Sequence, residues 1–299
     1  MIALSTSLFE GLSGDEMANR ASDLGFSFVE INFRLNEKQT KDLIRAASKL
    51  NISISSLHNF VPEPPEGERS FMLSDLDESL RKKAVELTVD TILLAEDIGA
   101  AAVVLHLGQP REWDYKTPQV ELRQAIHANA DYNIIEDLKN NLIEGRKRLP
   151  SLYLDSILTS LDKVVNATSN TNVKLGVENR YFYGQFPSHE EIGIILQEFS
   201  GSNIGYWHDC GHGAHDEYCG LSESLKNLNI FKDRLVGIHL HDINDWYDHQ
   251  LPSSGGKVNF NDVSKSLSDN HVKVLEPGPW VNQSKITEAL QYLNSAGIA

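Results

Sequence analysis

Eight short apolar segments alternate with stretches of helical spacing, and this alternation constrains the fold more than any other feature of the chain. The expected strands cover residues 2–6, 28–32, 52–58, 101–106, 173–178, 203–209, 235–241 and 271–276. A strand that precedes a helix in every repeat implies a parallel sheet, and eight such repeats suit closure into a barrel. The segment Ala101–His106 is apolar almost throughout, as expected for a strand buried on both faces.

The chain of 299 residues suits a single α/β barrel, which takes about 250 residues. Residues 110–170 form the longest stretch without an expected strand, and apolar residues at helical spacing predict two or three extra helices there. We therefore expect a single-domain (β/α)8 TIM barrel over residues 1–299, with extra helices between strands four and five. An open doubly wound sheet is the alternative, but no glycine-rich dinucleotide fingerprint follows the first strand.

The composition is that of an ordinary globular protein, with 40% hydrophobic and 23% charged residues. The net charge of −15 disfavours nonspecific binding to nucleic acid or to an anionic membrane. No apolar run approaches the roughly 18 residues of a membrane span, and the first residues lack the features of a signal peptide. Two cysteines, Cys210 and Cys219, give no disulfide framework. We expect a cytoplasmic protein without membrane association.

Four metal-type side chains stand where apolar strands are expected to end, namely Glu178, Asp209, His239 and Glu276. In an α/β barrel the carboxyl ends of all strands meet at one face, where active sites lie. Three carboxylates that point into one barrel mouth repel each other unless protons or a cation compensate their charge. A divalent metal is the simplest solution, and a cluster neutralised by nearby arginine and lysine side chains is the structural alternative.

One imidazole and three carboxylates suit Mn²⁺, Mg²⁺ or Co²⁺. Further histidines gather at the same expected rim, and they keep Zn²⁺ and a second or third metal open. A single histidine at a strand end is as often a hydrogen-bonded structural residue as a ligand, but scattered structural histidines would not be expected to gather at one rim. The candidates for a second metal or for substrate contact are His58, His106, His212, His241 and His249.

Four other side chains are candidates for binding a small substrate. Arg180, two residues beyond Glu178, suits a carboxylate or phosphate, and orientation of Glu178 by an ion pair is an equal alternative. Trp113 and Trp246 offer flat apolar faces, and loop packing is the alternative for both. Glu30 lies in the second expected strand, where a structural role for a buried acid is an equal alternative.

Six short motifs follow one another at the ends of expected strands three to eight. They are His58, His106-Leu-Gly108, Val177-Glu178-Asn179, Asp209-Cys-Gly-His212, His239-Leu-His-Asp242 and Leu275-Glu276. In order and spacing the chain resembles the xylose isomerase-like TIM barrel superfamily over essentially its whole length. This group includes sugar isomerases and epimerases, inosose dehydratases and endonuclease IV-type enzymes that cut DNA at abasic sites. The motifs are specific for the superfamily but do not select one member.

The resemblance to ketose 3-epimerases implies one divalent metal held by Glu178, Asp209, His239 and Glu276. It also implies that Glu178 and Glu276 form the acid/base pair of a sugar or sugar-phosphate isomerase or epimerase, which transfers a proton through an enediolate that the metal stabilises. His212 would match a substrate-binding histidine. We take this as the expected activity, and homo-oligomers are common in the group.

Two positions depart from the ketose 3-epimerase pattern. Gly184 and Asp245 stand where those enzymes carry a glutamate and an arginine. The chain therefore lacks two of the side chains with which those enzymes bind their substrate, and the identity of the substrate does not follow from the resemblance.

Two other activities on the same barrel stay open. Endonuclease IV-type enzymes hold three zinc ions with nine ligands, and eight of them have counterparts among the histidines and carboxylates named above. At the ninth position Tyr247 replaces an aspartate, and Asp248 stands beside it. The loop after the third strand carries three glutamates against one arginine between residues 63 and 69, which is a poor surface for DNA. An inosose dehydratase-type lyase, or a barrel that only binds a small molecule, is the remaining alternative.

Overall fold

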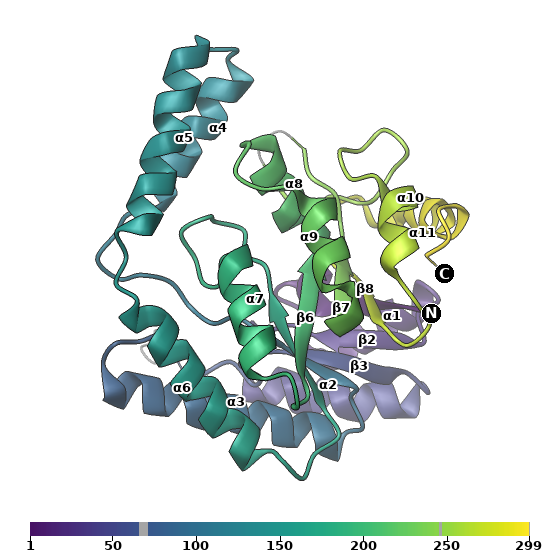
Figure 1. Cartoon of the computed structure of the whole chain (residues 1–299). Helices are drawn as coiled ribbons and strands as arrows, with labels where there is room; N and C mark the ends of the chain where they lie inside the picture. Colours follow the sequence, from purple (N-terminus) through teal and green to yellow (C-terminus); the bar gives the residue numbers. More distant parts are fainter. Residues whose placement is uncertain (66–70, 245–246, 299) are drawn as a thin grey trace.

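The eight expected strands form a closed parallel barrel in the computed structural model, which describes residues 1–65, 71–244 and 247–298 (Figure 1). The strands are β1 (Ile2–Ser5), β2 (Phe28–Ile31), β3 (Ser53–His58), β4 (Ala102–Leu105), β5 (Lys174–Glu178), β6 (Ile204–Asp209), β7 (Leu235–Leu240) and β8 (Val272–Leu275). Each strand pairs with the next one in the chain, and β1 closes the barrel against β8, with Ala3 opposite Val274. The TIM barrel is confirmed, and the open doubly wound sheet is excluded.

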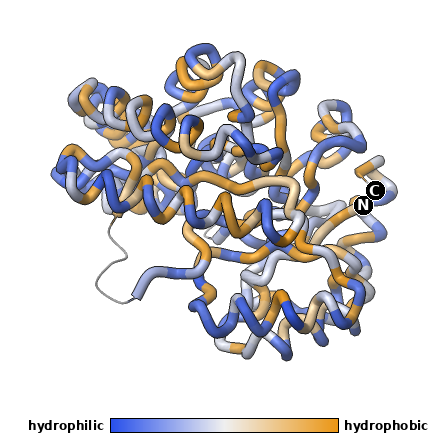
Figure 2. The backbone as a smooth tube through the Cα atoms, turned by 90° about the horizontal axis from the view of Figure 1, so that it is seen from below, coloured by the Kyte–Doolittle hydropathy of each residue, from blue (hydrophilic) through white to orange (hydrophobic). Residues whose placement is uncertain are grey.

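Helices connect the strands and cover the outside of the barrel (Figure 1). They are α1 (Gly14–Asp23), α2 (Glu37–Lys49), α3 (Glu78–Asp97), α4 (Lys116–His127), α5 (Tyr132–Lys147), α6 (Leu152–Ala167), α7 (His189–Glu198), α8 (Cys210–Tyr218), α9 (Ser224–Phe231), α10 (Phe260–Val263) and α11 (Ile286–Ser295). Reciprocal capping boxes, such as that of Ser13 and Glu16, open α1, α2 and α7. Along the helices in Figure 2 hydrophilic and hydrophobic residues alternate, as expected for helices with one buried face.

Three helices lie between β4 and β5, where the sequence predicts two or three. Helix α6 packs against α3, whereas α4 and α5 pack against each other and project away from the barrel (Figure 1). Leu122 and Leu142 join these two helices, and Cys219 at the end of α8 completes a small apolar cluster apart from the main core. The projecting pair is therefore tied to the segment that follows the sixth strand.

A separate small cluster fills the inside of the barrel. Trp207 is fully buried there, with Val104 and Val274 beside it. Its indole needs the glycines of the neighbouring strands, because a Cβ at Gly176 would lie 2.8 Å from the ring and one at Gly237 would overlap it. Trp207 lies two residues before Asp209 on the same strand face, so the indole fills the barrel beneath the strand ends.

The sixth strand passes directly into a helix at the face where the active site is expected. Helix α8 begins at Cys210 because the side chain of Asp209 accepts the backbone N–H of His212 at 2.7 Å and caps the helix. The helix ends before Gly220, whose φ of +65° suits glycine. His212 therefore lies in the first turn of a helix rather than in a loop.

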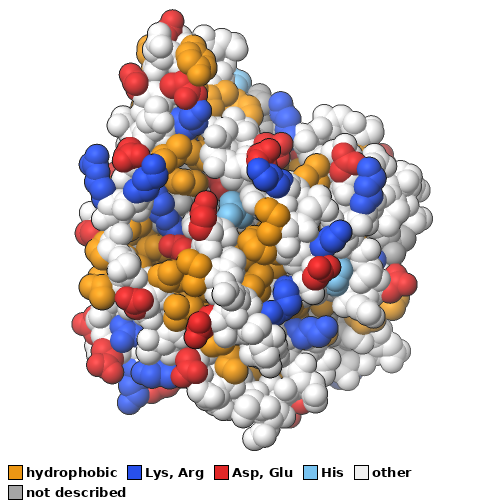
Figure 3. All heavy atoms as spheres, in the orientation of Figure 1, with side chains coloured by type: hydrophobic (Ala, Val, Ile, Leu, Met, Phe, Trp, Pro, Cys, Tyr) orange, Lys and Arg blue, Asp and Glu red, His pale blue; other side chains and the backbone are white. Residues whose placement is uncertain are grey.

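The described surface carries charges of both signs. On the face drawn in Figure 3, lysine and arginine side chains are interspersed with acidic ones and form no continuous basic track. Among the described residues, no helix combines the length and the apolar character needed to cross a membrane. A basic groove for nucleic acid is thus not seen on this face.

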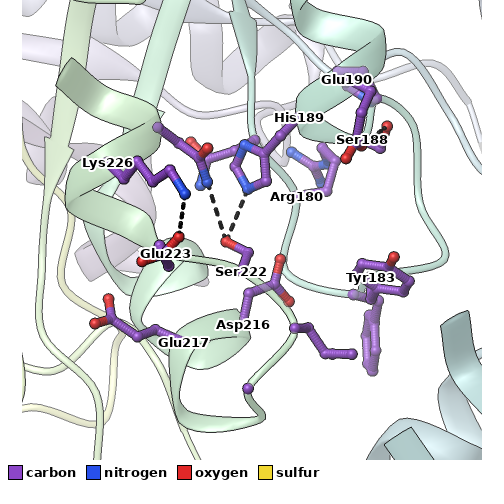
Figure 4. Close-up of a pocket in the computed structure, with 16 residues that line it drawn as sticks. Arg180, Tyr183, Ser188, His189, Glu190, Asp216, Glu217, Ser222, Glu223 and Lys226 are labelled. Carbon is purple, nitrogen blue, oxygen red and sulfur yellow. Dashed lines mark hydrogen bonds and ion pairs between the residues drawn. The ribbon is translucent and has the colours of Figure 1, made fainter. Parts of the chain in front are cut away.

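A cavity of about 560 Å³ lies between the start of α7 and the loop that joins α8 to α9 (Figure 4). Asp216 of α8 lines this cavity with only 7% of its surface exposed, and its Oδ1 has no hydrogen-bond partner among the described residues. Burial raises the pKa of Asp216 to about 8, although Arg123 and Arg146 act in the opposite direction. Asp216 therefore keeps its proton in the folded protein up to neutral pH.

The fit between Trp207 and its glycines predicts a coupled loss of stability. Gly237→Ala should lower the free energy of unfolding by about 1–3 kcal/mol, because the added methyl group overpacks the barrel. The double variant Gly237→Ala/Trp207→Phe should lose less than the sum of the two single variants, since the smaller ring leaves room for the methyl group. Urea unfolding measures the stability of all three variants.

Gly193→Ala is the matched control: its Cβ would lie 3.8 Å from Phe231, so the helix should be unharmed or gain stability. Simple additivity of the two barrel substitutions would contradict the prediction.

Asp216→Asn tests the protonation of this buried carboxyl. The unfolded chain loses the proton near its ordinary pKa of 3.8, whereas the folded protein holds it up to about pH 8. Folding therefore takes up a proton between these values, and the stability of the wild type falls as the pH rises through this window. The asparagine variant lacks this dependence and should exceed the wild type by about 1–3 kcal/mol at pH 8–9, a difference that shrinks toward pH 4. Urea unfolding across this pH range would refute the idea if the difference stayed constant.

Candidate active site

The four central ligand candidates converge on one nitrogen atom. Glu178 ends β5, Asp209 ends β6, His239 lies near the end of β7, and Glu276 follows β8 directly. The Nδ1 atom of His239 lies 2.8 Å from Glu178 Oε1 and 3.1 Å from Glu276 Oε2. Asp209 Oδ2 is 3.4 Å from the same nitrogen. All four side chains are buried, so strand ends far apart in the sequence form one compact group.

The charges of this buried group are balanced by protons and neighbouring cations. Burial alone would raise the pKa of Glu178, but contact with His106 and the charge of Arg180 outweigh it and hold that pKa well below its usual range. Burial raises the pKa of Glu276 to about 8. Burial alone would lower the pKa of His239, yet the nearby carboxylates, Glu276 first, hold it well above its usual range. A divalent cation would take the place of these protons, so the donor set fits a metal ion.

Two histidines form a second group around Glu178. His106 Nε2 lies 2.7 Å from Glu178 Oε2, and His58 Nε2 lies 3.8 Å from Glu178 Oε1. Burial lowers the pKa of both imidazoles, that of His106 to about 4, so both are neutral, as metal coordination requires. Ligand atoms of the three residues lie within 4.8 Å of one another.

A third group forms around Asp248. His212 Nδ1 lies 2.9 Å from the carbonyl oxygen of Asn179, and His249 Nδ1 lies 2.9 Å from that of Glu276. Each ring therefore uses Nδ1 on the backbone and keeps Nε2 for another partner. The two Nε2 atoms lie 3.5 Å and 3.7 Å from Asp248 Oδ2. Two imidazoles and a carboxylate thus face one another, as in a metal site.

His241 joins the third group to the first. Its Nε2 lies 2.9 Å from Asp209 Oδ2, and its Nδ1 accepts the backbone N–H of His249 at 2.9 Å. Burial alone would lower the pKa of His241, but Asp209 raises it to about 9. Asp209 therefore serves the central group and the third group at once.

Asp248 lies beside the histidines of the third group, one residue beyond the position that spacing indicates. The sequence puts Tyr247 at the ninth ligand position of the three-metal pattern, but Tyr247 is 63% exposed. The carboxylate that approaches the histidines belongs to the next residue, Asp248. A shift of one residue in the loop after β7 explains the difference, and the acid beside the expected position is the signal that points to it.

Arg180 pairs with Glu178 and also lines two cavities. Its guanidinium pairs with Glu178 Oε2, so it orients this carboxylate. It also lines a cavity of about 270 Å³ together with Glu178, Glu276 and His249. On its other side it borders the larger cavity of Figure 4. Arg180 therefore lies between that larger cavity and the central, second and third groups, which we call the metal-type groups.

The cavity over the metal-type groups has aromatic walls, and two of its aromatic residues, Phe33 and Tyr181, were not indicated by the sequence. Phe33, Tyr181 and Trp280 line it, and Arg34 adds a second cation. Asn32 lies at its edge, where its side-chain amide donates to Glu276 Oε1 at 3.4 Å. These residues follow strand ends, but no metal-type side chain marks them in the sequence.

Two other substrate-binding candidates lie elsewhere. Trp113 packs in the apolar cluster of α4 and α5, where a Cβ at Gly145 would overlap its ring, and it does not line the cavity. Glu30 is fully buried and contacts Nε2 of His239, so it lies against the central ligand rather than in the cavity. Trp246 lies outside the described residues.

Comparisons with known proteins agree with this architecture. A family model described as xylose isomerase-like TIM barrel matches residues 18–296. The uncharacterised protein MJ1614 of Methanocaldococcus jannaschii is 24% identical over 206 residues, which are 68% of this chain and 65% of that protein's length.

Solved structures with the same barrel cover nearly the whole chain. The 3-keto-D-glucoside 4-epimerase YcjR of E. coli superposes with a TM-score of 0.70 at 12% identity, over 98% of both chains. A D-tagatose 3-epimerase-like protein gives 0.66 at 20% identity, again over 98% of both chains. An L-ribulose 3-epimerase gives 0.69 at 13% identity, over 99% of this chain and 94% of the other. At these identities the likeness to solved structures shows the fold alone. The family model, however, matches almost the whole chain. The chain therefore belongs to the xylose isomerase-like TIM barrel family.

Proposed function

We propose that this protein is a divalent-metal-dependent isomerase or epimerase of a sugar or sugar phosphate, with Glu178 and Glu276 as its acid/base pair. One observation carries the proposal. The two glutamates lie at the ends of strands five and eight, face the same nitrogen of His239, and line the same 270 Å³ cavity. The three solved structures compared above, whose names are those of sugar epimerases or an epimerase-like protein, support the same reaction class.

A bound divalent cation would polarise a substrate carbonyl and the hydroxyl beside it. One glutamate then removes the proton from the substrate carbon, and the other returns a proton, from the opposite face in an epimerisation. The ion pair with Arg180 orients Glu178, and the amide of Asn32 orients Glu276. Both bases are therefore held in position before a substrate arrives.

The cavity suits a small polar ring better than a polymer. Its volume of about 270 Å³ lies near the lower end of ligand pockets, which begin at about 300 Å³. Trp280 and Phe33 give apolar faces to one side of a sugar ring, while Arg180 and Arg34 suit a phosphate or hydroxyl groups. Gly184 packs against Tyr115, where a Cβ would overlap the ring, so the glutamate of ketose 3-epimerases has no room here. The substrate is therefore held by other residues than in those enzymes.

A zinc-dependent phosphodiesterase is the second candidate, and the group around Asp248 favours it. Together with the central group and the second group of His58 and His106, it would complete three adjacent metal positions of the endonuclease IV type. A hydrolase of this type would use a metal-activated hydroxide on a phosphodiester. The acidic loop after β3 and the net charge of −15 argue against a DNA duplex as its substrate. The number of bound metals separates the two candidates, and a lyase of the inosose dehydratase type would share the one-metal outcome.

Substitution of either glutamate should stop proton transfer and leave the fold intact. Glu178→Gln and Glu276→Gln should each lower the exchange of solvent deuterium into an accepted ketose or ketose phosphate by about 10²–10⁴-fold. Proton NMR in D₂O measures this exchange for a panel of such sugars after loading with Mn²⁺ or Co²⁺. Glu288→Gln on the exposed side of α11 is the matched control and should exchange at the wild-type rate. Full activity with normal metal content in both site variants would refute the acid/base assignment.

The metal content gives an independent test. Mass spectrometry of protein purified without an affinity tag or added metal should find about one Mn, Co or Mg, or one exchangeable Zn, per chain. Asp248→Asn should leave this number unchanged, because the third group is then a substrate-contact region. Two or three tightly held Zn ions per chain, with one lost in Asp248→Asn, would favour the phosphodiesterase, and cleavage of abasic-site DNA would be assayed next. A protein that binds no metal after reconstitution would contradict both candidates.

A further inference from the structure

Glu30 is a further buried acid, deeper in the barrel than the metal-type groups. It comes from β2, is fully buried, and does not line the cavity of about 270 Å³ among the described residues. Its Oε2 accepts a hydrogen bond from Ser56 Oγ at 2.8 Å. Among the described residues its other hydrogen-bonding contacts are to His239, so a substrate in the cavity does not reach it.

The two nitrogens of His239 face opposite levels of the barrel. Nε2 lies 3.1 Å and 3.2 Å from the two oxygens of Glu30. Nδ1 faces the three carboxylates of the central group, with Glu178 Oε1 nearest at 2.8 Å. A metal held by these carboxylates therefore meets Nδ1, and Nε2 is directed away from it. A neutral imidazole that coordinates through Nδ1 must carry its proton on Nε2.

The partner that Nε2–H then needs is already present. A carboxylate accepts this N–H, fixes the plane of the ring, and makes the coordinating nitrogen a better donor. Ser56 donates a hydrogen bond to the same carboxylate, so a chain of hydrogen bonds runs from Ser56 on β3 through Glu30 on β2 to His239 on β7. We propose that Glu30 is a positioning residue that holds His239 in the tautomer with Nδ1 open to the metal. This inference rests on the metal site of the proposed function and adds a residue to it.

Metal binding can test this role without any substrate. Co²⁺ is titrated into the full-length protein in competition with a chelator, and the visible absorption of bound Co²⁺ is recorded. Glu30→Gln should weaken Co²⁺ binding by about 10–100-fold and change the visible spectrum, because loss of an outer carboxylate loosens the ring that it orients. Ser56→Ala should weaken binding less, since Glu30 itself remains.

Asp75→Asn serves as the matched control for loss of a buried carboxylate. Asp75 is 2% exposed and pairs with Arg111 at 2.5 Å, outside the metal-type groups. This variant should lose stability but keep the Co²⁺ affinity and spectrum of the wild type. Glu30→Gln with affinity within twofold of the wild type and an unchanged spectrum would overturn the positioning role while leaving the metal site intact. Absence of Co²⁺ binding in the wild type would overturn the metal site and the positioning role together.

The tautomer can also be read in the wild-type protein, so this measurement needs no Glu30 variant. Nitrogen-15 NMR of histidine-labelled protein loaded with Zn²⁺ should show His239 coordinated through Nδ1 and protonated at Nε2. The resonance is assigned by its absence in His239→Gln. Coordination through Nε2 would contradict the inference directly.

Discussion

Mutual repulsion among buried carboxylates is the constraint on which the site depends. Glu30, Glu178 and Asp209 are fully buried, and Glu276 is nearly so, within reach of a single imidazole. Charges in such a place are costly unless protons, cations or hydrogen bonds compensate them. Besides this compensation, the closed barrel, whose strands are hydrogen-bonded on both sides, holds the group together because it fixes where each strand ends. A cation at the proposed metal site would relieve this repulsion, which the fold sets up before any ion arrives.

The surroundings distribute this charge over several elements. The Asp209 carboxylate caps α8, contacts His241 and faces His239, so one side chain links helix start, third group and central group. Glu178 is held from three sides by His106, His239 and Arg180. Movement of any one partner changes the electrostatic balance of the others. Side chains that look like separate ligands in the sequence therefore act as one network.

The sequence predicts the barrel and the four central residues because both follow from simple rules. Parallel strands must end at one face, and an acid at the end of an apolar run is visible in one dimension. The orientation of a ring is not visible in this way: nothing in the sequence tells which nitrogen of His239 meets the carboxylates. The contact of Glu30 depends on the depth at which β2 lies relative to β7, and strand tilt sets that depth.

Two further differences come from loops and insertions. The choice between Tyr247 and Asp248 depends on one step of chain in the loop after β7, which spacing cannot resolve. Trp113 is a residue type that suits a sugar-binding rim, but it packs in the apolar cluster of the projecting pair of helices, against Gly145. Where the chain departs from the regular repeat, local packing rather than the barrel rule decides the position of a side chain.

Trp207 gives the site a direction. Its indole occupies the barrel interior below the carboxylates, in the space that Gly176 and Gly237 leave free. Water, ions and substrates therefore approach the glutamates from the rim alone. In the proposed reaction, a substrate seated in that opening would leave the two glutamates no second path to bulk solvent, so their carboxyl groups would exchange protons with the medium between turnovers. For such a reaction, the size of one core side chain would bear on when isotope from the medium reaches the product.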